Sequence, residues 1–247
     1  MKTTYAFTVA LIVLAPTFAL AQAPPAAPAP PPPRWERKAE ASFVSTGGNT
    51  DTQSLGLGAS VVFRAAPWTT ESRVAFVRNE ADDVETARSF TADLREARAL
   101  SDRVEVFGRY GYLRDPFAGI DHRNTIDGGL GYKLLMGPVH TLRVDAGLGY
   151  THEGRATGEA QSFALVNIGS AYKWQISQSA DITDSAVFTQ SLEEHDAWRF
   201  NNVFAISAAI TKILSLKLSH DIKFNNSPVP GFEKTDRITS AAIVAKF

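Results

Sequence analysis

Apolar and polar residues alternate one by one along most of the chain after residue 35. In the clearest run, every second position between 141 and 150 is apolar: Leu142, Val144, Ala146, Leu148 and Tyr150. Successive side chains of a β-strand point to opposite faces, so this pattern predicts strands that each have one apolar face. A helix, with its period of about 3.6 residues, cannot produce such runs. The chain is therefore expected to fold as an all-β protein.

Turn-forming residues separate the alternating runs and divide this part of the chain into about twelve predicted strands, within a range of about ten to fourteen. The predicted strands cover residues 36–46, 52–65, 70–80, 86–99, 103–113, 122–135, 139–151, 160–173, 180–191, 198–211, 213–225 and 236–247. The connections alternate between tight turns, such as Met136-Gly137-Pro138, and mostly longer polar loops, such as Arg114 to Asp121. This layout is typical of an up-and-down antiparallel sheet.

The alternation alone does not tell which face points inward. A soluble barrel that binds an apolar ligand buries its apolar face, whereas a membrane barrel turns that face to lipid. About twelve strands enclose a lumen wider than the side chains of a small barrel fill. The polar face is also rich in Gly, Ser, Thr, Asn and charges of both signs. These features favour a transmembrane up-and-down antiparallel β-barrel over residues 35–247, with the soluble barrel as the alternative.

Aromatic residues gather at both ends of the predicted strands on the apolar face. Near the tight turns they are Phe63, Trp68, Tyr132, Tyr172, Trp174 and Phe247, and near the long loops they are Tyr110, Tyr112, Tyr150, Trp198 and Phe200. Two such bands match the girdles that aromatic side chains form at membrane interfaces. Phe247 also closes an alternating last strand, which resembles the signal that outer-membrane barrels present to the barrel-assembly machinery. We therefore expect that machinery, outer-membrane lipid and lipopolysaccharide as partners of a monomeric barrel.

The N-terminal part of the chain differs in composition from the rest. Lys2, the apolar segment Val9–Leu14 and the small-x-small site Ala19-Leu20-Ala21 predict a secretory signal peptide over residues 1–21. Residues 22–34 consist almost entirely of Ala and Pro, which predicts an extended spacer without a core of its own. An exported barrel of this kind is expected in the outer membrane of a Gram-negative bacterium. The spacer would then lie on the periplasmic side.

Composition excludes or disfavours several classes of function. The chain has no Cys, which excludes thiol catalysis and thiolate metal ligands, and its five His show no ligand spacing. Its 25 basic and 26 acidic residues give a net charge of −1, which offers no reason to expect nucleic-acid binding. Ser219-His220-Asp221 suggests a lipase-like enzyme as a less favoured alternative, but adjacent strand residues point to opposite faces. We therefore predict no enzymatic activity, no metal and no cofactor.

Opposite charges occupy the polar face of neighbouring predicted strands. These residues are Asp93, Arg95, Glu105, Arg109, Asp127, Lys133, Arg143 and Asp145. They are expected either to line an ion path or to form an internal salt-bridge lattice that plugs the lumen and fixes the strand register. The plug is the preferred interpretation, because no ring of one sign is evident.

The long loop after residue 114 contains carboxylates among Pro and Gly residues. Asp115 and Asp121 are of the type that binds a hard cation. We expect instead that the loop is held by its own Asp–Arg pairs, since Arg123 follows closely in the sequence.

Two parts of the chain resemble a known family. The similar residues are the turn Thr46-Gly47-Gly48-Asn49-Thr50-Asp51, the loop residues Asp115, Phe117, Gly119, Asp121 and Arg123, and the segment Gly129-Leu130-Gly131-Tyr132. They resemble motifs of the YdiY-like family of salt-induced outer-membrane proteins, domain of unknown function 481. The resemblance covers residues 36–247, implies an outer-membrane barrel with no established activity, and supplies no catalytic residues. The expected role is structural and related to envelope stress, or that of a narrow pore with a charged lumen.

Overall fold

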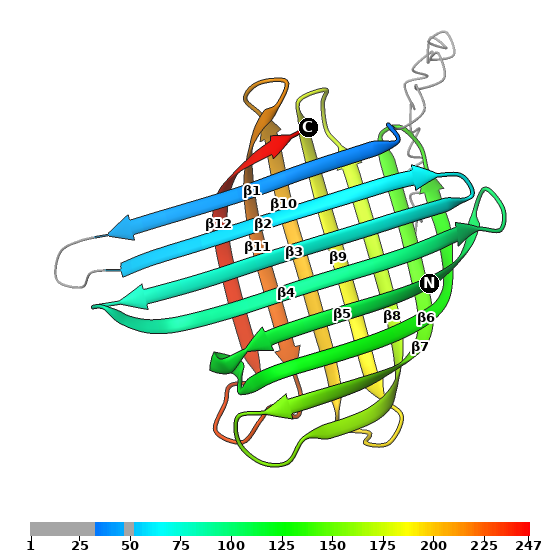
Figure 1. Cartoon of the computed structure of the whole chain (residues 1–247). Helices are drawn as coiled ribbons and strands as arrows, with labels where there is room; N and C mark the ends of the chain where they lie inside the picture. Colours follow the sequence, from blue (N-terminus) through cyan, green and yellow to red (C-terminus); the bar gives the residue numbers. More distant parts are fainter. Residues whose placement is uncertain (1–32, 47–51) are drawn as a thin grey trace, which may run out of the picture. The chain divides into compact units, whose positions relative to one another are not determined.

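The computed structural model describes residues 33–46 and 52–247. The predicted signal peptide, most of the predicted spacer and residues 47–51 of the family-like turn lie outside the described residues. The described chain forms a closed barrel of twelve antiparallel strands, in which strands that follow one another in the sequence also pair in space (Figure 1). The predicted fold class is confirmed.

The strands follow one another around the ring in chain order. They are β1 (Trp35–Thr46), β2 (Thr52–Ala65), β3 (Trp68–Ala81), β4 (Val84–Ala99), β5 (Val104–Asp115), β6 (Ile120–Met136), β7 (His140–Arg155), β8 (Gln161–Gln175), β9 (Ala180–Ser191), β10 (Trp198–Ala209), β11 (Leu214–Asn225) and β12 (Thr235–Lys246). The short 3-10 helix η1 (Pro116–Ala118) lies between β5 and β6. Within the described residues, no helix is long and apolar enough to cross a membrane. The predicted strand ends differ most at β7, which continues to Arg155 rather than ending at 151.

The strands turn most of their apolar residues outward and most of their charged residues toward the lumen, although Phe107, Phe163 and Leu165 are buried on the lumen face. Near the middle of β7, outward-facing Leu148 is 64% exposed, whereas lumen-facing Asp127 in β6 and Glu105 in β5 are each 5% exposed. Leu148 lies opposite Gly128 of β6 and Val166 of β8, which continue the outward row. This arrangement is that of a membrane barrel and not of a soluble barrel with an apolar interior.

The eleven aromatic residues expected at the strand ends lie on the outward face. Seven of them are at least 36% exposed: Trp68, Tyr110, Tyr132, Tyr150, Trp174, Phe200 and Phe247. The other four, Phe63, Tyr112, Tyr172 and Trp198, are half-buried. Their rings pack against aromatic neighbours on adjoining strands, as Trp198 does on Phe224 with ring centroids 4.7 Å apart. These contacts hold flat rings against the outer wall at both ends of the barrel.

Two pairs of polar residues interrupt the outward apolar face of the C-terminal strands. In the first, the Asn202 side-chain amide donates to Asp184 Oδ1 at 2.8 Å. In the second, His220 Nδ1 lies 2.8 Å from Thr239 Oγ1. Each pair satisfies a polar group that hydrocarbon cannot solvate, which reduces the cost of placing it on this face.

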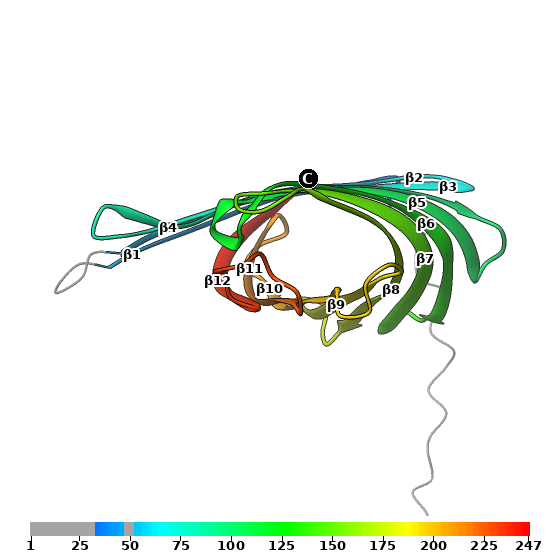
Figure 2. The same cartoon turned by 90° about the horizontal axis from the view of Figure 1, so that it is seen from below.

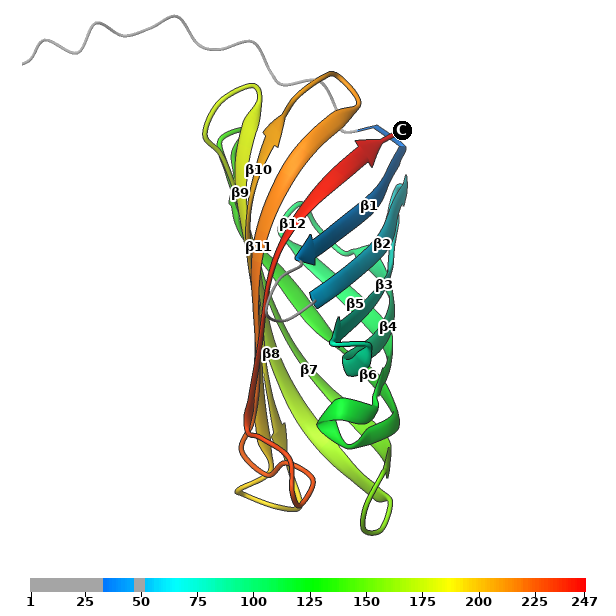
Figure 3. The ribbon, with the colours of Figure 1, turned by 90° about the vertical axis from the view of Figure 1, so that its left-hand side faces the viewer.

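The seam between β1 and β12 closes the ring over a short distance. Only four positions pair across it, from Lys38↔Lys246 to Ala41↔Ile243, whereas β1 pairs with β2 along its whole length. Figure 3 shows β1 ending partway along β12. Seen from below, β1 to β4 extend sideways beyond the ring (Figure 2). The lumen is therefore enclosed most completely by β5 to β11.

Candidate functional site in the barrel lumen

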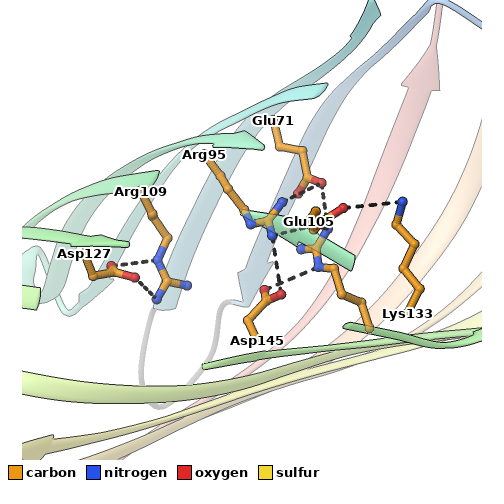
Figure 4. A network of polar contacts seen from close by, with 8 residues as sticks. Glu71, Arg95, Glu105, Arg109, Asp127, Lys133 and Asp145 are labelled. Atoms are coloured by element: carbon orange, nitrogen blue, oxygen red, sulfur yellow. Dashed lines mark hydrogen bonds and ion pairs between the residues drawn. The ribbon is translucent and has the colours of Figure 1, made fainter. Parts of the chain in front are cut away.

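Six charged side chains, which we call the central network, gather on the lumen face of β3 to β7. They are Glu71, Arg95, Glu105, Lys133, Arg143 and Asp145 (Figure 4). Strand pairing places Gly131 between Glu105 and Asp145. A Cβ atom at Gly131 would meet Asp145 Oδ1 at 2.7 Å and Glu105 Cγ at 2.9 Å. The glycine therefore leaves room for carboxylates from both neighbouring strands.

The central network is held together by short contacts between guanidinium and carboxylate groups. Arg95 Nη2 donates to Glu105 Oε1 at 2.6 Å and to Asp145 Oδ1 at 3.3 Å. Arg143 Nη1 donates to Glu71 Oε1 at 2.9 Å. Lys133 Nζ lies 3.4 Å from Glu105 Oε2. The network contains three acidic and three basic groups, so its formal charges cancel.

The central network reaches across part of the lumen rather than along its wall. Glu71 belongs to β3 and Arg143 to β7, and three strands separate them around the ring. Their side chains meet because both project into the concave interior. Arg95 is 6% exposed and Glu105 is 5% exposed. The network therefore obstructs the side of the lumen that β3 to β7 enclose.

A separate ion pair lies beside the network toward the long-loop end of the barrel. Arg109 Nε and Nη2 both donate to the carboxylate of Asp127, each at 2.9 Å. Asp93 shares the lumen face, but it makes no ion pair with any described residue at 4.0 Å or less. Of the eight charged residues predicted to form one lattice, the structure thus joins five in the network and pairs two separately. Glu71, which is not among the eight predicted residues, also belongs to the network.

A cavity of about 380 Å³, the lumen chamber, lies on the long-loop side of the central network. The charged residues of its wall include Arg73, Asp93, Arg109, Asp127, Arg123, Arg199, Asp221 and Lys223. None of the six network residues belongs to this wall. The network therefore lies outside the chamber, nearer the tight-turn end of the barrel, and the chamber wall combines charged groups with apolar side chains such as Leu165 and Val203.

Loops from opposite sides of the ring meet at the mouth of the chamber. Gly119, after η1, has the left-handed φ of 74°, and a Cβ there would lie 2.7 Å from the Phe232 ring and 2.8 Å from Val229. Val229, in the connection between β11 and β12, is only 1% exposed. Ala118 and Pro228 border the chamber from these two loops. The loops therefore cover part of the opening.

A second charged group, the rim cluster, lies where the strands reach the long loops. Glu153 is completely buried and accepts from Arg123 Nε at 2.6 Å, Arg155 Nε at 2.7 Å and Arg199 Nη2 at 2.8 Å. These side chains come from β6, β7 and β10. The predicted strand ended at residue 151, which placed Glu153 and Arg155 in a loop. Residues two apart lie on the same face of a strand, so the spacing of these two charges is the feature of the sequence that agrees with a longer β7.

The loop from Asp115 to Arg123 is not held by its own Asp–Arg pairs, so that expectation is wrong. Asp115 Oδ1 accepts from the backbone N–H of Ala118, and Asp115 Oδ2 lies 3.6 Å from Lys223 Nζ. Arg123 faces the lumen and pairs with Glu153 instead. Of the other three members of the motif, Phe117 and Asp121 are exposed, and Gly119 lies against the loop that contains Phe232. Within the described residues, no group of three or more His, Asp or Glu side chains is arranged to hold a metal.

The Ser219-His220-Asp221 segment does not assemble a nucleophile and its base. The Ser219 hydroxyl lies 2.9 Å from the Ser240 hydroxyl on the lumen side, whereas His220 contacts Thr239 on the outward side. The barrel wall therefore separates the serine from the histidine, which the lipase alternative requires to be in contact.

Comparison with known proteins gives one family and a fold. The model of a family described as "Protein of unknown function, DUF481" matches residues 39–247. The uncharacterized protein YdiY of Escherichia coli K12 is 25% identical over 214 residues, which cover 85% of this chain and 82% of YdiY. The NanC porin has a TM-score of 0.50 at 10% identity, with 85% of this chain and 98% of that chain covered. An outer-membrane channel of Pseudomonas putida F1 has a TM-score of 0.50 at 11% identity, with 86% and 94% covered.

Proposed function

The chain belongs to the DUF481 family of proteins of unknown function, and we propose that it is an outer-membrane channel for small charged solutes with the central network as its constriction. The observation that carries this proposal is the lumen chamber of about 380 Å³, which has charged groups of both signs in its wall. A channel for charged solutes requires such a space inside the barrel. The fold is also that of two outer-membrane pores, which agrees with this location.

The central network is suited to restrict passage without strong preference for one sign of ion. Its three acidic and three basic groups neutralise one another, so no ring of one charge is left to select among ions. Beside the network, the lumen face of β8 and β9 carries the small residues Gly169, Ala171 and Ser185. The restriction therefore comes from one side of the lumen. We expect a low conductance that is set by the size of the opening.

Single-channel recording in planar bilayers tests this proposal. The paired change Glu71→Ala with Arg143→Ala removes the contact that reaches from β3 to β7 and takes away one charge of each sign. The conductance should rise severalfold. The matched control is Arg78→Ala with Glu80→Ala, an ion pair on the outward face, and it should leave the conductance unchanged. An equal conductance in the wild type and the network variant would mean that the network is not the constriction.

A plugged barrel with a structural role is the second candidate. The deep burial of Arg95 and Glu105 and the loops that meet over the mouth favour it. It predicts a protein that refolds, migrates with heat-modifiable mobility in gels and gives no current. Silence in both the wild type and the network variant would favour the plug over the channel.

A further inference from the structure

The rim cluster contains more positive charge than its single carboxylate neutralises. Arg123, Arg155 and Arg199 all pair with Glu153, and none of them makes an ion pair with another carboxylate of the described chain. The cluster therefore has a formal charge of +2. Its arginine side chains are only 9–14% exposed, so water screens these charges poorly.

Most of the hydrogen-bond donors of these arginines are unused. Each guanidinium has five N–H donors, and each gives a single hydrogen bond, to Glu153. The remaining donors make no hydrogen bond with any other residue that the structure describes. Arg123 and Arg199 also border the lumen chamber. Free donors of two buried guanidiniums therefore face a space that a solute can occupy.

We propose that the rim cluster binds an oxyanion, the carboxylate or phosphate group of a solute in the lumen chamber. A planar guanidinium matches both groups with two parallel N–H donors, and such charge-assisted pairs are among the stronger hydrogen bonds in proteins. This inference deepens the proposed channel function, because the oxyanion belongs to a solute that enters the lumen. The chamber volume of about 380 Å³ lies within the size of small-molecule sites.

The protein environment prepares the rim cluster for a ligand. Glu153 holds one edge of each guanidinium, so the arginines do not have to be ordered when the solute binds. The Arg199 guanidinium also lies over the Phe163 ring, 5.4 Å from its centroid, and that ring is 6% exposed. An oxyanion would supply the negative charge that the cluster lacks. The central network, whose charges already cancel, has no such requirement.

Equilibrium dialysis of the refolded full chain in detergent tests this site. Radiolabelled inorganic phosphate is the probe in one arm and radiolabelled acetate in the other, both at low ionic strength. Arg199→Gln and Arg123→Gln should each weaken phosphate binding by about tenfold, the effect of one lost charge-assisted contact. Arg103→Gln is the matched control, because it removes the same charge from an exposed position in the tight turn between β4 and β5, outside the chamber, and it should leave binding unchanged.

Glu153→Gln provides a test in the opposite direction. It keeps all three arginines and removes their internal carboxylate, so phosphate should bind more tightly. No binding of either probe, or equal loss in Arg199→Gln and Arg103→Gln, would overturn the site. If the arginine variants fail to fold, unchanged or weaker binding in Glu153→Gln would overturn it. Binding of both probes supports a general oxyanion site, and binding of phosphate alone supports one for phosphoryl groups.

Failure of the site and failure of the channel give different results. Dialysis needs no current, so phosphate binding by a protein that is silent in bilayers would refute the channel and keep the site. A conducting protein that binds neither probe would refute the site and keep the channel.

Discussion

Leu148→Arg is the most direct test of which face of the barrel contacts lipid. Leu148 lies near the middle of β7 and is 64% exposed on the outward face. Its neighbours on that face include Ile126 and Leu130 on β6 and Ile168 on β8, which are 55–64% exposed. An arginine at this position would therefore sit in the centre of an apolar belt, far from either end of the strand.

The expected cost follows from this depth. An arginine on the lipid face near the bilayer midplane destabilises a membrane barrel by about 2–4 kcal/mol, which corresponds to a roughly 30- to 900-fold smaller folding equilibrium constant. Reversible denaturation in lipid vesicles, followed by Trp fluorescence, measures this difference directly. The matched control is Ser185→Arg, since Ser185 also lies mid-strand, in β9, but faces the lumen.

The control should cost much less, because a lumen-facing arginine has water and the carboxylates of the network nearby. Equal destabilisation by Leu148→Arg and Ser185→Arg would refute the assignment of the two faces. A larger loss for Ser185→Arg would indicate that the apolar face is the packed interior.

Three further changes test other parts of the structure. Asp184→Leu should raise the free energy of unfolding in vesicles by about 1 kcal/mol, because it removes from the lipid face a carboxylate that is hydrogen-bonded to Asn202. A loss of stability would show that this hydrogen-bonded pair is structurally required. Gly119→Ala should cost about 1–3 kcal/mol in the same assay, because the left-handed φ and the contacts with the opposite loop leave no room for a Cβ; a neutral effect would mean that the loops do not meet over the mouth. Glu105→Gln should cost about 3–5 kcal/mol, because Arg95 stays buried with its main partner uncharged; a cost below about 1 kcal/mol, the value of an exposed ion pair, would mean that water reaches the network freely.

The fold could be predicted from sequence because one physical rule acts on every membrane-spanning residue. Lipid on one side and a polar lumen on the other impose a period of two, and this period revealed all twelve strands. The alternation of apolar and polar residues ends where the strand extends beyond the apolar belt. In β7, residues 151–155 have polar or small side chains on both faces, so the alternation disappears although the strand continues to Arg155. The apolar alternation therefore does not indicate the rim cluster.

The charged contacts could be predicted only in part, because register defines neighbours along the wall but not across the lumen. Arg109 and Asp127 lie opposite each other on adjoining strands, and their pairing follows from the strand order. Glu71 and Arg143 are 72 residues apart in the sequence, and their contact depends on the curvature of the whole ring. Arg123 is close in the sequence to Asp115 and Asp121, but it pairs with Glu153 on the adjoining strand. Proximity in the sequence is therefore a poor guide to partners in the lumen.

The central network and the rim cluster show that the number of arginines in a lumen does not by itself indicate its role. Both groups contain a fully or nearly buried carboxylate, Glu105 or Glu153, and both are built from guanidinium–carboxylate contacts of similar length. They differ in how many carboxylates lie within reach. In the network, each positive charge has a negative charge to match it, so no net charge is left for a ligand to neutralise, although Arg95 Nε and Nη1 and Arg143 Nε are buried donors without a hydrogen-bond partner. In the rim cluster, three guanidiniums share Glu153, and burying the two unmatched charges costs free energy that an anion can offset. Under the proposed channel function, the excess positive charge of the rim cluster would serve recognition of a solute, and the balanced charge of the central network would serve restriction of its passage.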